Sequence, residues 1–84
     1  MEVYNIQIGA VEQLEKLVDI VRRFSCDVNL VNDLGCVDCK SILGVLRMGL
    51  SKRLKLEVIG SREESEALVE ELSGEFPISL KEVK

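Results

Sequence analysis

The spacing of apolar residues changes along this chain, and this change limits what the chain can fold into. Residues 1–8 alternate between apolar and polar side chains, whereas residues 11–24 carry apolar side chains three and four positions apart. The first pattern is typical of a half-buried β-strand and the second of an amphipathic helix. A chain of 84 residues that mixes both patterns has room for one hydrophobic core, so we expect a single domain over residues 1–84.

The same two patterns recur through the rest of the sequence. We predict strands over residues 1–8, 27–31, 36–39 and 53–59, and helices over residues 11–24, 41–48 and 61–74. A turn-forming Asn-Asp-Leu-Gly stretch at residues 32–35 predicts an antiparallel hairpin between the second and third strands. Ser61 and Glu64 have the spacing of a capping box at the start of the last helix. Residues 76–84 form a C-terminal tail, and their pattern fits an extended segment as well as a frayed one.

This order of elements (βαββαβα) favours an α+β domain with two layers. We expect a four-stranded, mainly antiparallel sheet with three helices packed on one face.

Composition excludes several classes of function. The net charge is −4 and aromatic residues are only 4% of the chain, so binding to nucleic acid or to an anionic membrane is disfavoured. The apolar runs are too short to span a membrane, and no leader pattern precedes the first strand, so we expect a cytoplasmic protein. The chain has no histidine, which removes imidazole acid–base chemistry and histidine-ligated metals. We expect no cofactor.

Residues 40–46 read Lys-Ser-Ile-Leu-Gly-Val-Leu, and they are followed by Met-Gly-Leu at residues 48–50. Together with Asp-Val-Asn-Leu at residues 27–30 and the strand pattern at 54–58, this stretch resembles the HPr family over about residues 24–72. HPr is the small histidine-containing phosphocarrier protein of the bacterial sugar phosphotransferase system. The resemblance implies an open-faced two-layer sandwich with the order of elements predicted above.

The resemblance also places the phosphocarrier motif of the family, in which a histidine, an arginine and a proline stand where the first strand meets the first helix. Counting back from the matched residues, Ala10 occupies the histidine position, Glu12 the arginine position and Gln13 the proline position. A methyl group cannot act as a nucleophile. We therefore expect a family member that is neither a phosphocarrier nor an enzyme and that resembles the histidine-lacking catabolite repression HPr.

A second family site is present in the sequence. In HPr and catabolite repression HPr, the serine of Lys-Ser-Ile is phosphorylated and then docks a transcriptional regulator, which makes Ser41 the candidate phosphorylation site. A helix start and the adjacent Lys40 both favour an anion there. The implied partners are proteins, namely a regulator or a kinase of the phosphotransferase system. The candidate partner-binding residues are Lys40, Ile42, Leu43, Leu46, Arg47 and Met48. Two structural roles stay open, because Ser41 also fits a plain helix cap and the apolar residues also fit a core.

Cys36 and Cys39 form a Cys-x-x-Cys pair and support an alternative function, a thiol-based metal-binding or redox protein. Residues three apart in a strand point to opposite faces, which argues against a shared site. Zinc needs four ligands, and only Cys26 and a carboxylate could complete them within the chain. A third hypothesis, a ferredoxin-like sensor of small molecules, shares most of the order of elements but explains neither the third helix nor residues 40–44.

Overall fold

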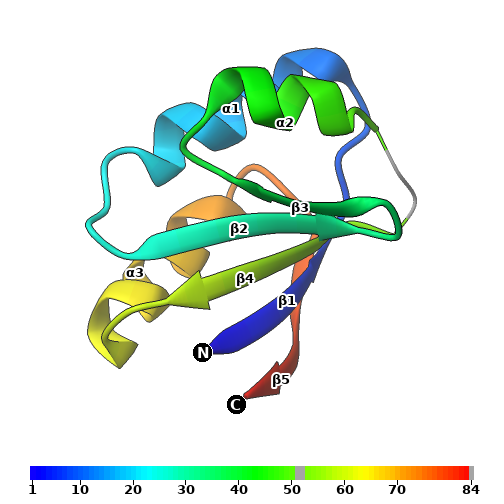
Figure 1. Cartoon of the computed structure of the whole chain (residues 1–84). Coiled ribbons are helices and arrows are strands. Elements are labelled where there is room, and N and C mark those ends of the chain that lie inside the picture. Colours follow the sequence, from blue (N-terminus) through cyan, green and yellow to red (C-terminus); the bar gives the residue numbers. More distant parts are fainter. Residues whose placement is uncertain (51–52, 84) are drawn as a thin grey trace.

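A computed structural model of the chain describes residues 1–50 and 53–83 (Figure 1). Within these residues the strands are β1 (Glu2–Ile6), β2 (Asp27–Asn32), β3 (Gly35–Asp38), β4 (Lys55–Ile59) and β5 (Ile78–Val83), and the helices are α1 (Val11–Val21), α2 (Ile42–Met48) and α3 (Arg62–Ser73). The predicted helices and the first four strands are all present. None of the helices in this part of the chain is long and apolar enough to cross a membrane.

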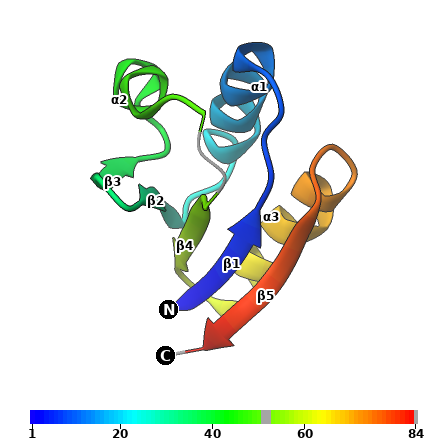
Figure 2. The same cartoon turned by 90° about the vertical axis from the view of Figure 1, so that its right-hand side faces the viewer.

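The strands form one sheet in the order β3-β2-β4-β1-β5, and every neighbouring pair runs antiparallel. The three helices lie on one side of this sheet, and its other side is uncovered (Figure 2). The α+β sandwich predicted from the alternation of patterns is therefore confirmed.

The core lies between the two layers and is built from aliphatic side chains. Alternate positions of the central strands, such as Tyr4, Val28 and Leu56, are buried towards the helices. Leu14 and Leu17 of α1 have no exposed surface and fill the space above them. Burial of apolar surface between the helices and the sheet stabilises a protein by roughly 25 cal/mol per Å². This burial is the main contribution to the stability of the fold.

The predicted count of four strands was incomplete, because β5 adds a fifth strand at the edge of the sheet next to β1. Phe76 is buried behind the end of α3, and the carbonyl oxygen of Pro77 accepts a hydrogen bond of 3.0 Å from the backbone nitrogen of Gln7. These two contacts turn the chain back along β1. The tail predicted over residues 76–84 thus includes an ordered strand, while Lys84 lies outside the described residues.

Two ion pairs link α1, or the residue that soon follows it, to α3 or the residues that follow α3. The Lys16 ammonium lies 2.9 Å from the Glu75 carboxylate, and Arg23 pairs with Glu71. Both pairs are partly exposed and each contributes at most about 1 kcal/mol.

Candidate functional site

The junction between β1 and α1 is where the family motif would hold a phosphoryl group. Ala10 is the N-terminal capping residue of α1, with extended backbone (φ −152°, ψ 154°). Its methyl group offers neither a nucleophile nor a hydrogen-bond acceptor. Glu12 follows in the first turn and is exposed, so it adds negative charge where a phosphoryl group would need positive charge.

Gln13 closes the same junction. Its side-chain oxygen Oε1 accepts hydrogen bonds from the backbone nitrogens of Gly9 (2.7 Å) and Ala10 (3.2 Å). Its own backbone nitrogen donates to the carbonyl oxygen of Ala10 at 3.0 Å. Backbone N–H groups at a helix start are the donors that commonly bind anions. Here the backbone N–H groups of Gly9 and Ala10, which precede α1, already donate to the Gln13 side chain.

Ser41 stands at the N-terminal end of α2, and its side chain is exposed. The hydroxyl oxygen accepts a long hydrogen bond of 3.4 Å from the backbone nitrogen of Gly44. The carbonyl oxygen of Ser41 accepts the first bond of the helix, from Val45 at 3.0 Å. Ser41 is therefore a helix cap, and its hydroxyl is at the same time accessible from solvent.

Two cationic side chains and one carboxylate lie next to Ser41. The Lys40 ammonium donates to the carbonyl oxygen of Phe24 at the end of α1 (2.9 Å), and Arg22 Nε donates to the carbonyl oxygen of Lys40 (2.9 Å). The Asp38 carboxylate accepts from the backbone nitrogen of Lys40 at 2.9 Å. Lys40 thus links the start of α2 to the segment after α1 rather than extending into solvent. The three side chains Arg22, Lys40 and Asp38 together carry one positive charge.

The predicted partner-binding residues of α2 divide into two groups. Ile42 and Met48 are half-buried and pack against the core. Leu43 is 72% exposed, Leu46 is 37% exposed, and Arg47 is also exposed. Because residues three and four positions apart share one side of a helix, these three form one surface, which we call the outer α2 face (Leu43, Leu46 and Arg47).

The three cysteines do not come together. Cys36 is exposed on the uncovered side of the sheet, whereas Cys26 and Cys39 are buried, and all three are free thiols. Burial raises the pKa of the Cys39 thiol to about 12, and the Asp38 carboxylate adds to the rise. Burial and the Glu57 carboxylate also raise the pKa of Cys36. Within residues 1–50 and 53–83 no group of His, Cys, Asp or Glu side chains is arranged to hold a metal ion.

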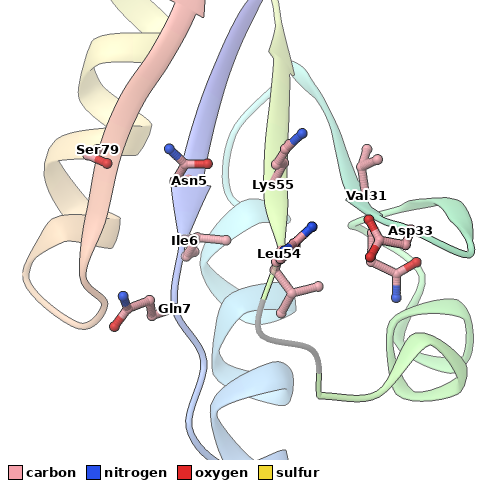
Figure 3. A pocket seen from close by; sticks show the side chains of 10 residues that line it. Asn5, Ile6, Gln7, Val31, Asp33, Leu54, Lys55 and Ser79 are labelled. Carbon is pink, nitrogen blue, oxygen red and sulfur yellow. The ribbon is translucent and has the colours of Figure 1, made fainter.

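Sequence reasoning missed a hollow on the uncovered side of the sheet (Figure 3). It has a volume of about 630 Å³, and its polar lining includes Asn5, Gln7, Asp33, Arg53, Lys55 and Ser79. The strand alternation marks several of these residues as facing away from the core. The sequence does not reveal that they surround a common space, because that depends on the strand order and register.

Comparison with known proteins agrees with this architecture. Residues 13–76 match the sequence profile of the family described as PTS HPr component phosphorylation site. The crystal structure of HPr-C-His from Thermoanaerobacter tengcongensis is similar to this fold, with a TM-score of 0.68 and 26% sequence identity over 88% of this chain and 93% of that one. No curated protein matches the chain.

The antiparallel sheet covered on one side by helices defines an open-faced sandwich of the phosphocarrier class. The chain belongs to the HPr family of the phosphotransferase system. Proteins of this family are phosphocarriers rather than enzymes, and they act by contacting other proteins of the phosphotransferase system. The matched range begins at Gln13, three residues after the candidate histidine position.

Proposed function

We propose that this chain is a regulatory, protein-binding member of the HPr family that does not carry phosphate on a histidine. In this proposal residues 1–84 form one cytoplasmic bacterial domain, which recognises a regulator or kinase of the phosphotransferase system through the outer α2 face. Phosphorylation of Ser41 controls that recognition.

The observation that carries the proposal is the chemistry at the start of α1. The chain contains no histidine, and Ala10 stands at the position that the family resemblance assigns to one. Covalent phosphoryl transfer requires a nucleophilic atom at the receiving position. Incubation with phosphoenolpyruvate and enzyme I, with an ordinary HPr as positive control, is the direct test, and we expect no label on this chain.

The surroundings of Ser41 support its role as the phosphorylation site. A phosphoserine adds a charge of about −1.5 to −2 at neutral pH and three strong acceptor oxygens. Arg22 and Lys40 lie beside this position, and the backbone nitrogen of Gly44 already donates to the serine oxygen. Asp38 opposes part of this attraction. A kinase can reach the hydroxyl because the side chain is exposed.

Treatment with ATP and the serine kinase of the family tests this role. We expect one phosphate per chain, located by mass spectrometry on Ser41 and lost in Ser41→Ala. Ser61 is a matched control, because it is also an exposed helix-capping serine, with its hydroxyl 3.2 Å from the backbone nitrogen of Glu64. Ser61→Ala should be labelled normally. Absence of label under conditions that label an ordinary HPr contradicts the serine proposal.

The outer α2 face supports the proposed mode of binding. Val45 is fully buried beneath the helix, so α2 is held firmly while Leu43 and Leu46 stay exposed. Exposed leucines beside an arginine supply both the apolar contact and the charge that protein interfaces use.

Binding of the phosphorylated chain to the transcriptional regulator of the system, measured by calorimetry, tests this face. We expect Leu43→Ser to weaken binding by about tenfold or more. Leu80→Ser is the matched control, because Leu80 is 54% exposed on β5, which is at the opposite edge of the sheet from β3. Equal effects of the two substitutions contradict the assignment of the face.

A further inference from the structure

A row of side chains, three of them short, crosses the uncovered side of the sheet. Ser79 of β5 is the cross-strand partner of Asn5 of β1, and Asn5 is the partner of Lys55 of β4. Lys55 is in turn the partner of Val31 of β2. Cross-strand partners have Cβ atoms about 4.5–5.5 Å apart. Four adjacent strands thus place these side chains in one continuous line (Figure 3).

The hollow forms along this row and extends towards one end of the strands. Ser79, Asn5 and Val31 have short side chains, which leaves space next to the longer Lys55. Gln7 follows β1, Arg53 precedes β4 and Asp33 follows β2, and all three line the hollow. The volume of about 630 Å³ falls in the range of small-molecule sites, roughly 300–1,000 Å³.

The lining is positive although the chain is acidic. The chain carries 15 acidic and 11 basic residues, whereas the hollow is lined by the cations Arg53 and Lys55 and by one carboxylate, Asp33. The cross-strand partners of Lys55 are an amide and an aliphatic side chain rather than an acid. A concave surface with an excess of positive charge raises the local concentration of anions.

The Lys55 ammonium differs in its ion pairing from cations of the helix layer. Lys16, Arg23 and Arg62 each pair with a glutamate. Within the described part of the chain, Lys55 has neither an ion pair nor a side-chain hydrogen bond. Its donor groups, and the amide of Asn5 beside it, are available to a bound molecule.

We propose that this hollow binds a small organic anion that also carries hydroxyl groups, such as a phosphorylated or carboxylated metabolite. Lys55 binds the anionic group, and Asn5, Gln7 and Ser79 bind the hydroxyl groups. The site faces away from α2, so its occupancy is independent of the proposed docking face.

Titration of the ¹⁵N-labelled protein, followed by NMR at constant ionic strength, tests this site. The ligands are glycerol 3-phosphate, malate and inorganic phosphate, with uncharged glycerol as the control. We expect saturable shifts at Asn5, Gln7, Lys55 and Ser79 with at least one organic anion and none with glycerol. A response to the two phosphates identifies a phosphate site, and a response to malate alone identifies a carboxylate site. Absence of saturable shifts there with every anion overturns the proposal.

Variants distinguish this site from general attraction of anions. Lys55→Gln should weaken binding by about tenfold, because it removes one charge-assisted hydrogen bond. Lys16→Gln, on α1, is the matched control and should leave binding unchanged. Asp33→Asn removes the negative charge of the lining and should strengthen binding. Equal weakening by the two lysine substitutions, or no strengthening by Asp33→Asn, contradicts the proposed site.

Discussion

The side-chain oxygen of Gln13 lies 3.2 Å from the backbone nitrogen of Ala10 and accepts its hydrogen bond. The same oxygen also accepts from Gly9 at 2.7 Å. Gln13 thus takes up two backbone donors at the position where the family resemblance places phosphate chemistry. These two hydrogen bonds hold the start of α1 in place, and the side chain at the candidate histidine position is a methyl group.

Gln13→Ala should lower the free energy of unfolding by about 1 kcal/mol, because it removes the acceptor for two backbone donors at the helix start. Urea denaturation measures the change. Gln13→Glu keeps an acceptor oxygen and should retain the stability, while Glu15→Ala, at an exposed position of the same helix, serves as the control. Equal stability of Gln13→Ala and Glu15→Ala contradicts a capping role for Gln13.

Ala10→His restores an imidazole but leaves the carboxylate of Glu12 in the first turn. We expect little transfer from phosphoenolpyruvate and enzyme I to this variant, because the negative charge repels the incoming phosphoryl group. Combining it with Glu12→Arg should raise the rate by at least about tenfold, since a favourable charge at close range is worth roughly 1–4 kcal/mol near a protein surface. Equal rates for the single and double variants contradict this electrostatic explanation.

Gly60 is required for close packing between the end of β4 and the chain before β2. A methyl group added there would lie 2.6 Å from Cβ of Cys26, so Gly60→Ala should destabilise the fold by about 1–3 kcal/mol. Gly74→Ala is the matched control, because its new methyl group would meet nothing closer than a carbonyl oxygen at 3.5 Å. Chemical denaturation compares the two, and a Gly74→Ala variant as unstable as Gly60→Ala contradicts this explanation.

The buried thiol of Cys39 predicts a loss of stability at alkaline pH. Its pKa is raised from 9.0 to about 12, so above pH 9 the unfolded chain releases a proton that the folded chain keeps. Stability is therefore fully present below that pH and falls above it, by up to about 1.4 kcal/mol per pH unit.

Urea denaturation at a series of pH values measures this loss. Cys39→Ala removes the titrating thiol, so the free energy of unfolding should fall less steeply with pH in this variant. Tyr4, whose pKa is raised from 10.0 to about 12 mainly by burial, adds to the loss at higher pH in both proteins. The test compares how steeply the free energy of unfolding falls between pH 9.0 and 10.0 in the two proteins. If the fall is equally steep in Cys39→Ala, the loss of stability does not come from Cys39.

Local signals in the sequence predicted the elements that depend on neighbouring residues. The capping box at Ser61 is one example, since the hydroxyl accepts from the backbone nitrogen of Glu64 at 3.2 Å. The predicted divergence of Cys36 and Cys39 is another, since Cys36 is exposed in β3 and Cys39, directly after that strand, is buried. Both depend on residues within a few positions of each other.

Features that depend on distant residues could not be predicted in this way. The strand β5 exists because it pairs with β1, more than 70 positions earlier in the chain. The Lys40 ammonium binds the carbonyl oxygen of Phe24 because the segment before α2 lies against the segment after α1. The hollow at Asn5, Lys55 and Ser79 requires three strands in register.

The central claim of the proposed function is that this HPr family member does not accept a phosphoryl group from phosphoenolpyruvate and enzyme I. Intact mass measured after incubation with phosphoenolpyruvate and enzyme I tests it most directly, with an ordinary HPr in the same reaction. We predict that the ordinary HPr gains one acid-labile phosphate while this chain keeps its unmodified mass. Transfer of an acid-labile phosphate to this chain, at a rate comparable to that of the ordinary HPr, would contradict the claim.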